Sequence, residues 1–506
     1  MALSAHGMKG SLVAYNFQPV DRNQRFLLPV DMADWLSRDH FVYFVIELVE
    51  QLDLSAFRSA YRPDGKGGAA YDPAAMVTLL AYAYCDGERS SRRIAEHCRT
   101  DIAYRLVMGG LLPDHSTISR FRDRHEKALA DIFVPILHVC LEAGMGDVSL
   151  AAVDGSKFRC PASLRANRKL AGIERELASI TEEIEVELTR IAGEILAASR
   201  RADLDDDTLF GPPPPREPGT LPEVVGLPKK LHGKAARRAR LAKAKELLDN
   251  EHRAQCTGYD ERMAGRAATE TATGKKIRGR KPAAPQRDPD QKINVTDPDS
   301  RIMKDAHGGY LQGYNAQNVV AKDRCNLAPQ VVNDEDDSAQ LHPMMDRTRE
   351  NLARAESAST VDLYLADSGY CTEASLAGID PDGSKVLLAT GKEHKTRAEA
   401  RQLPVNDGTP PEGLSRKEKM AWERNTAAGK AAYAQRAATV EPGFAQHKHN
   451  RGMFFFLRAG LPAVDSEWKL INATDNIEKL YRRMLTGKAT AGWSTVGRLI
   501  CLSPAT

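Results

Sequence analysis

The spacing of apolar residues divides the chain into a helical first part and a later part that mixes strands with helices. From residue 26 to about 145, apolar residues recur every three or four positions, which predicts several short helices. Pro73 stands at the start of one of them, and Gly87 is expected to end it. Ser90 and Ser91 can cap the next helix, "RRIAEHCRTDIAYRLVMGG" (92–110), which the pattern extends without a break.

A basic helix is expected at the end of this part. Ser116 can cap a helix in "LLPDHSTISRFRDRH". That helix carries Arg120, Arg122 and Arg124. Short helices with sharp turns and a basic final helix can dock on DNA in the manner of a helix-turn-helix. A plain helical bundle with solvated arginines fits the same pattern, so both interpretations stay open.

Two later apolar runs each deliver an aspartate into a turn. "VSLAAVDGSKF" (148–158) predicts a buried strand that ends at Asp154 and the turn Gly155–Lys157. "VDLYLADSGY" (361–370) predicts a second strand, closed by Asp367. Side chains at the carboxyl ends of such strands project into the crevice where α/β proteins bind ligands. We therefore expect the two carboxylates to line one crevice.

The region between the two runs has a different character. Residues 170–199 show a long charged helix pattern, 211–228 are a Pro-rich break, and 229–245 form a basic helix pattern. Together they predict a helical hairpin with a flexible tip, followed by a basic linker at 272–286. From Lys292 onward, strand-length runs alternate with helices, which predicts an α/β domain interrupted by the helical insertion.

Composition narrows the class of protein. The 506 residues are 42% hydrophobic and 27% charged, an ordinary globular balance that suggests two or three domains. The net charge of +3 makes no strong case for a polyanion partner of the chain as a whole. The eight cysteines are far apart, with no CxxC pair, which favours free thiols in a reducing compartment over disulfides or zinc. We find neither a membrane-length apolar run nor a signal peptide, and expect a cytoplasmic protein.

The paired aspartates suggest metal chemistry. Two carboxylates brought together repel, and one takes a proton unless cations neutralise them. Carboxylate oxygens suit Mg²⁺, and two such ions can promote in-line phosphoryl displacement. That reading needs a third acid, since a single aspartate at a strand end is more often a turn residue or a helix cap.

A candidate for the third acid is Glu441. With Tyr433, Arg436 and Lys448 it can share one face of a helix, within an arc of about 140°. Such a face can bind a metal at the acid and phosphates at the cations. A solvated, charged helix face is the plain alternative, and Pro442 disfavours helical geometry at Glu441.

At this point the chain resembles a known family. Its segments "AAVDGSKF", "NVTDPDSRIMK", "GYLQGYNAQNVV", "YLADSGY" and "YAQRAATVEPGFAQHK" are similar, in this order, to DDE-type transposases of bacterial insertion sequences. That family belongs to the ribonuclease H-like integrase superfamily. The segments at 71–98 and 112–125 resemble the helical domain that precedes the catalytic core in one branch. The resemblance spans most of residues 25 to 485.

The resemblance implies roles for individual residues. Asp154 and Asp367 look like the first and second catalytic aspartates, and Glu441 looks like the family's glutamate. The family's signature is Tyr, two residues, Arg, three residues, Glu, six residues, Lys. Here four residues separate Arg436 from Glu441, which departs from that spacing. Two rival acids, Glu467 and Glu478, have no Lys seven positions on and lie in a packing helix around Trp468.

The resemblance also implies an α+β multidomain fold. We expect a flexible N-terminus (1–25), a helical DNA-binding domain (26–146) and a ribonuclease H-like mixed sheet flanked by helices. The segments 147–162 and 291–485 supply that sheet domain, 163–290 form the helical, Pro-rich and basic insertion, and 486–506 are a tail.

Cofactors and partners follow from the same resemblance. Asp154, Asp367 and Glu441 would hold two Mg²⁺ ions, with Mn²⁺ as a substitute, for cleavage at the transposon end and transfer to target DNA. Phosphate contacts are expected from Tyr433, Arg436, Lys448, Arg120 and Arg122. The basic stretches 229–245 and 275–281 could follow the DNA backbone, and 297–301 and 312–317 could line the cleft. The protein is expected to be a homodimer when bound to DNA, associated with the nucleoid and with no membrane.

Two other classes of function remain at this stage. A catalytically inactive, transposase-derived DNA-binding regulator would keep the helical domain and lose turnover. A structural or interaction role would leave the three acids unexplained.

Overall fold

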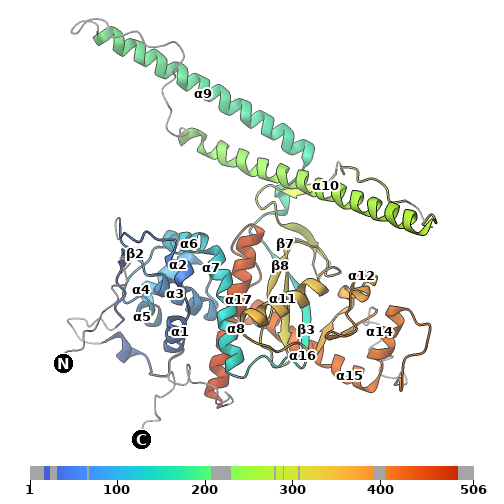
Figure 1. The fold of residues 1–506 in the computed structure, drawn as a ribbon. Coiled ribbons are helices and arrows are strands. Elements are labelled where there is room, and N and C mark those ends of the chain that lie inside the picture. The colour runs from blue at the N-terminus through green and yellow to red at the C-terminus, as the bar shows by residue number, and fades with distance from the viewer. Residues whose placement is uncertain are drawn as a thin grey trace, which may run out of the picture. The chain divides into compact units, whose positions relative to one another are not determined.

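The computed structural model describes residues 16–22, 31–64, 68–206, 229–277, 281–288, 290–305, 308–391 and 405–487 (Figure 1). It combines many helices with a mixed β-sheet, as the sequence predicts. The chain forms two compact units: Met1–Pro161 with Met303–Thr506, and Ala162–Ile302. The Pro-rich stretch 211–228, residues 1–15 and the tail from 488 lie outside the described residues.

The first part of the chain is helical, as predicted. Its helices α1 to α8 are Phe41–Glu50, Ser55–Arg58, Pro73–Cys85, Ser91–Thr100, Ile102–Val107, His115–Arg124, Glu126–Asp131 and Phe133–Glu142. A short 3₁₀ turn (Met32–Trp35) and the two-residue strands β1 (Phe17–Gln18) and β2 (Ala70–Tyr71) accompany them.

Two aspartates set helix boundaries that the sequence analysis missed. The carboxylate of Asp114 accepts hydrogen bonds from the backbone N–H groups of Ser116 and Thr117, so Asp114, and not Ser116, caps α6. Asp101 does the same for Ala103 and thereby starts α5 where one continuous helix was expected. An aspartate side chain is as good a cap as serine, and its position decides which amides it reaches.

The sheet lies in the first unit. Its strands are β3 (Ala151–Arg159), β6 (Arg301–Lys304), β7 (Tyr310–Ala321), β8 (Gln330–Val332), β9 (Leu363–Ala366) and β10 (Lys385–Leu388). They are ordered β10-β9-β3-β7-β6, and β8 also pairs with β7. The strands β10, β9 and β3 are parallel, whereas β7 is antiparallel to β3. The strand β3 is thus central, with a parallel neighbour on one side and an antiparallel one on the other.

The strand β3 is longer than predicted. All of its residues pair with Gly313–Ala321 of β7, so the expected turn at Gly155–Lys157 is extended strand, and Asp154 lies within the strand and not at its end. Pairing with β9 involves only Ala151 and Ala152. Asp154 therefore lies just past the point where β3 parts from its parallel neighbour.

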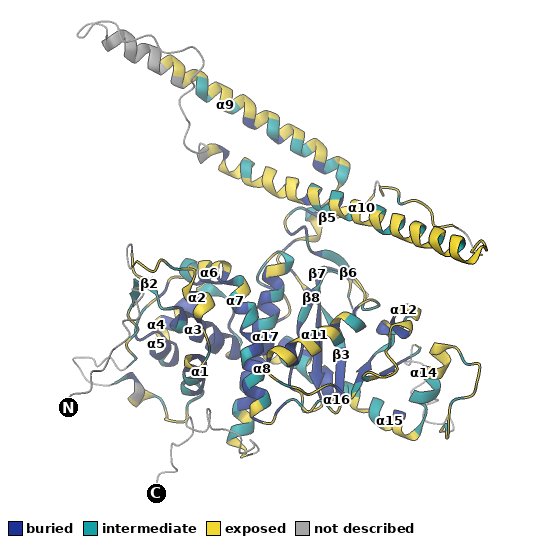
Figure 2. Cartoon of the chain, viewed as in Figure 1, coloured by how far each residue is buried: buried dark blue, intermediate teal, exposed yellow. Residues whose placement is uncertain are grey.

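Helices cover the sheet. They are α11 (Leu341–Arg354), α12 (Glu373–Ala377), α14 (Arg416–Arg424), α15 (Ala427–Tyr433), α16 (Gln435–Ala445) and α17 (Leu461–Leu485). The most deeply buried is α17, which contacts α3, α7, α8 and β8 (Figure 2). Its Trp468 is fully buried against Phe158 and Phe456, and the indole N–H donates to the Gln317 carbonyl at 2.9 Å.

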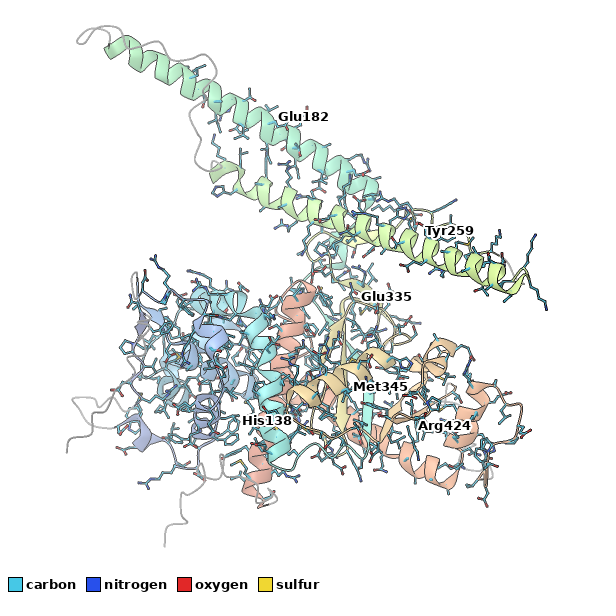
Figure 3. All side chains as sticks on the ribbon, viewed as in Figure 1. His138, Glu182, Tyr259, Glu335, Met345 and Arg424 are labelled. Carbon is cyan, nitrogen blue, oxygen red and sulfur yellow. The ribbon has the colours of Figure 1, made fainter. Side chains whose placement is uncertain are left out.

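The second unit is a helical hairpin. The helix α9 (Leu170–Asp206) packs along α10 (His232–Thr273) around a small apolar cluster that includes Ile173, Ile180 and Leu241. A two-stranded ribbon, β4 (Asn167–Lys169) with β5 (Lys292–Asn294), joins its ends. Basic residues of α10 pair with acids of α9: Lys234–Glu183, Arg237–Glu176 and Lys245–Glu174. Figure 3 draws the side chains of both helices, with Glu182 labelled on α9 and Tyr259 on α10. Part of the basic stretch 229–245 is thus neutralised within the hairpin.

None of the helices that the structure describes combines the length and the apolar character needed to span a bilayer.

Candidate active site

Asp154 and Asp367 come together because their strands are neighbours. In the parallel pairing, Ala151 faces Tyr364 and Ala152 faces Leu365. Carried two positions further, the same register sets Asp154 opposite Asp367, which follows the last residue of β9. The two carboxylates are close enough for the charge of Asp367 to act on Asp154.

Each aspartate is held by a backbone amide. Asp154 accepts from the N–H of Gly155 at 2.9 Å, and Asp367 accepts from the N–H of Gly369 at 2.8 Å. The pKa of Asp154 is raised to about 6, chiefly by burial and in part by the charge of Asp367, although the Arg436 guanidinium opposes both. Ionising Asp154 beside Asp367 therefore costs electrostatic free energy, which a bound cation would reduce.

Arg436 and Tyr433 anchor the helices α15 and α16 to the same place. Arg436 Nη1 lies 3.3 Å from Asp154 Oδ2, and both side chains are mostly buried. The hydroxyl of Tyr433 donates to the carbonyl of Ala366, the residue before Asp367, at 3.3 Å. Arg436 thus contacts β3 and Tyr433 contacts the end of β9, which are the two strands that carry the acids.

Lys448 contacts β3 from the helical turn that follows α16. It belongs to a π-helical turn, Gln446–Asn450, that continues α16. Its Nζ donates to Ser156 Oγ at 2.6 Å and lies 4.6 Å from the centre of the Phe158 ring. Burial lowers the pKa of Lys448. Since Asp154 and Ser156 lie on the same face of the strand, Arg436 and Lys448 both reach that face.

Glu441 is placed differently. It lies on α16, where it is exposed, and it is turned about 140° around the helix from Arg436. Its side chain makes no hydrogen bond or ion pair to the residues that the structure describes. Nor do any three His, Cys, Asp or Glu side chains in the described part of the chain form a group that could hold a metal ion.

The two rival acids have structural contacts. Glu467 is fully buried, pairs with Arg89 at 2.6 Å and accepts from the backbone N–H groups of Leu457 and Arg458 at 3.0 and 3.1 Å. Glu478 pairs with Arg451 and, on the same helix, with Arg482. Both carboxylates are therefore engaged by the protein itself.

A third aspartate, which the sequence analysis did not single out, lies beside the pair. Asp337 Oδ1 accepts from the side-chain amides of Asn315 at 2.8 Å and Gln317 at 2.6 Å. Both amides come from β7, within the stretch 312–317 that was expected to line the cleft. The sequence signal was a group of four amide side chains, Gln312, Asn315, Gln317 and Asn318, in one strand, because buried amides need partners.

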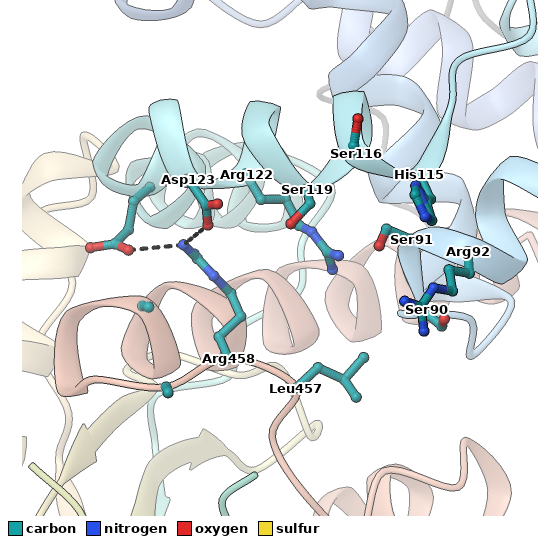
Figure 4. A pocket seen from close by; sticks show the side chains of 13 residues that line it. Ser90, Ser91, Arg92, His115, Ser116, Ser119, Arg122, Asp123, Leu457 and Arg458 are labelled. Atoms are coloured by element: carbon teal, nitrogen blue, oxygen red, sulfur yellow. Dashed lines mark hydrogen bonds and ion pairs between the residues drawn. The ribbon is translucent and has the colours of Figure 1, made fainter. Parts of the chain in front are cut away.

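The arginines of α6 are divided between solvent and interior. Arg120 is exposed and donates to Ser116 Oγ at 2.7 Å. Arg122 is buried, and its Nη1 donates to the carbonyl of Arg89 at 2.8 Å and contacts the Tyr84 hydroxyl at 3.4 Å. Figure 4 shows it at the wall of a pocket that Ser90, Ser91, Arg92, His115 and Arg458 also line.

Comparison with known proteins gives two family matches. Residues 30–124 match the transposase domain DUF772, and residues 396–481 match a transposase DDE domain. The first match ends at the last residue of α6, and the second contains Tyr433, Arg436, Glu441 and Lys448, whereas Asp154 and Asp367 lie outside both. No curated protein and no solved structure matches the chain. The two matches together support a DDE-type insertion-sequence transposase.

Proposed function

We propose that the protein cleaves and joins DNA at the ends of an insertion sequence, with Asp154 and Asp367 as the central acids of its active site. The observation that carries the proposal is the pairing of β3 with β9, which sets the two aspartates side by side at the point where the strands part. The mixed sheet, with β3 between a parallel and an antiparallel neighbour, supports a ribonuclease H-like core built from 147–162 and 291–485.

The two carboxylates fit a divalent cation. Their oxygens are the hard ligands that Mg²⁺ prefers, and Mn²⁺ accepts the same set. Burial raises the pKa of Asp154 to about 6 even with Arg436 at 3.3 Å, which supports a site where a further cation would favour the ionised form. Two divalent ions at such a site stabilise the attacking and leaving oxygens of phosphodiester chemistry.

The residues of the protein supply position and charge. Arg436 holds the carboxylate of Asp154 in place, and Tyr433 fixes the end of β9 next to Asp367. Lys448 keeps a half-buried cation on the same face of β3, where a DNA phosphate could be held. These contacts order the acids before DNA arrives, which reduces the cost of positioning at the moment of reaction.

Glu441 is proposed as the third acid. It lies between Arg436 and Lys448 on one continuous helical segment, and both of those residues contact β3. Glu441 is exposed, and its carboxylate makes no bond to the described side chains. The side chain can therefore change rotamer to bind a metal ion without breaking a contact to the protein.

DNA binding is proposed for the helical part, 26–146. Arg120 offers an exposed cation on α6, the last helix of the first family match. The buried Arg122 supports that helix from within. Because two ends must be joined, we propose that two copies of the chain act together on DNA.

The proposal is tested with supercoiled DNA that carries the ends of the element. Purified protein should nick it in the presence of Mg²⁺ or Mn²⁺. Asp154→Ala, Asp367→Ala and Glu441→Ala should each abolish cleavage and leave binding to the end sequence intact. An Asp154→Ala or Asp367→Ala protein that still cuts would refute the assignment, and wild-type protein that binds the ends and never cuts would point to a regulator.

A further inference from the structure

Asp337 lies at the centre of a hydrogen-bonded network next to the two acids. The hydroxyl of Tyr370 donates to Gln317 Oε1, and the other end of the same amide, Nε2, faces Asp337. Gln317 Nε2 then donates to Asp337 Oδ1 at 2.6 Å, and Asn315 Nδ2 donates to the same oxygen at 2.8 Å. The two amide donors on Oδ1 therefore fix the position of the Asp337 carboxylate.

Tyr370 is suited to hold this network in place. It is buried, and burial raises the pKa of its phenol well above the ordinary value, with the charges of Asp337, Asp154 and Asp367 adding to that effect. The phenol therefore stays neutral and remains a donor at any physiological pH. It also follows directly on the Asp367 turn, which ties the network to that acid.

Glycines leave the room that brings Asp337 close to both acids. A Cβ on Gly155, the residue after Asp154, would lie 2.6 Å from Asp337 Oδ1. A Cβ on Gly369, two residues after Asp367, would lie 3.6 Å from Asp337 Oδ2 and 3.0 Å from Asp367 Oδ1. The carboxylate of Asp337 thus fills the space next to Gly155 of β3 and next to the Asp367 turn, and its Oδ2 faces that turn.

We propose that Asp337 is a positioning residue for cation binding by Asp154 and Asp367. Asn315 and Gln317 hold its carboxylate beside the two acids, so that a third acidic group lies next to the pair without being one of the proposed ligands. This inference rests on the proposed function, since it takes the pair to bind a divalent cation. Groups that support metal ligands in this way typically change metal affinity about 10- to 100-fold when they are altered.

The test measures Mn²⁺ binding to the full-length protein by calorimetry in the absence of DNA. Asp337→Asn keeps the size of the side chain and an acceptor oxygen but removes the charge, so it should weaken Mn²⁺ binding about 10- to 100-fold. Asp336→Asn is the matched control: Asp336 is the exposed neighbour, bound to Ser338 at 3.0 Å. Its loss should change the affinity no more than about twofold, because exposed charges are screened.

A conservative variant guards against a folding defect. Asp337→Glu keeps the charge, so it should bind Mn²⁺ more tightly than Asp337→Asn, and the melting temperature without metal reports whether each variant is folded. Wild-type affinity in a folded Asp337→Asn protein would overturn the inference, as would equal losses in the Asn and Glu variants.

The two proposals fail in different ways. If Mn²⁺ binding requires Asp154 and Asp367 but is unaffected by the change at Asp337, only the inference about Asp337 fails. If wild-type protein shows no Mn²⁺ binding that depends on Asp154, the proposed function and the inference fail together.

Discussion

Arg436 on α16 forms an ion pair with Asp154 on β3, with 3.3 Å between Nη1 and Oδ2. The pair joins two segments that are 282 residues apart in sequence. Even so, the pKa of Asp154 remains raised, because burial and the charge of Asp367 outweigh the attraction of a single guanidinium. The two carboxylates therefore have less positive charge nearby than their ionised forms need.

Removing the guanidinium should make Asp154 harder to ionise. In Arg436→Met the pKa of Asp154 should rise further, by on the order of 1 unit. Because metal binding competes with the proton, the pH at which Mn²⁺ binding reaches half of its maximum should rise with it. Titration of Mn²⁺ binding from pH 5 to 9 checks this, with Arg436→Lys as the control that keeps the charge. An unchanged midpoint in Arg436→Met would contradict it.

Neutralising Asp154 should stabilise the metal-free fold at neutral and alkaline pH. A folded-state pKa of about 6 lies above the value in the unfolded chain. The folded state therefore holds this proton more tightly, and stability is lost as pH rises from about 4 through 6. Asp154→Asn should melt a few degrees higher than wild type at pH 8 and at about the same temperature at pH 4.

The pKa of Asp336 is shifted in the opposite direction to that of Asp154, so its effect on stability should have the opposite sign. Hydrogen bonds from Ser338 lower its pKa, so its ionised form stabilises the fold above the pKa of the unfolded chain. Asp336→Asn should thus melt slightly below wild type at pH 8. An Asp154→Asn protein less stable than wild type at pH 8 would refute the electrostatic account of the pair.

Breaking the buried pair of Arg89 and Glu467 should damage the fold and not the metal site. Glu467→Gln leaves a buried guanidinium without its counter-charge, which costs about 3–5 kcal/mol in comparable cases. Chemical unfolding should show a loss of this size, while Mn²⁺ binding by the folded fraction stays at the wild-type affinity. Loss of Mn²⁺ binding with unchanged stability would instead make Glu467 a ligand.

Two arginines that are two residues apart on α6, and so lie on different faces of the helix, should behave differently. Arg120→Ala should weaken binding to the end sequence and reduce the slope of log affinity against log salt by about 0.9, the effect of one phosphate contact. Arg122→Ala should lower stability by about 1–3 kcal/mol, since the carbonyl of Arg89 loses its donor. Binding assays at several salt concentrations and thermal unfolding of both variants separate the two effects. An equal loss of DNA affinity in both, at wild-type stability, would contradict this division.

The sequence predicts the elements of this protein better than their boundaries. The helical first part and the two strands that carry Asp154 and Asp367 follow from apolar periodicity, which reports burial directly. The apparent turn after Asp154 is extended strand because nine residues of β3 pair with β7, more than a hundred and fifty residues later. A local pattern contains no trace of such pairing.

Local sequence patterns also did not predict which side chains lie next to Asp154 and Asp367. Asp337 lies in an acidic run with nothing to distinguish it from Asp336, and only the fold shows which of the two meets Asn315 and Gln317. The helical spacing of α6 does place Arg122 on the face of Ile118, but only the fold shows that its partner is the carbonyl of Arg89 on another segment.

The most direct test of the account is Mg²⁺-dependent nicking of supercoiled DNA that carries the element's ends, compared between wild type and Asp367→Asn. The two side chains have nearly the same size, and the Asn oxygen can still accept from the N–H of Gly369. The account predicts that wild type nicks the DNA at the ends and that Asp367→Asn binds the same ends without nicking. Nicking by Asp367→Asn at the wild-type rate would contradict the assignment of the two aspartates as the active site.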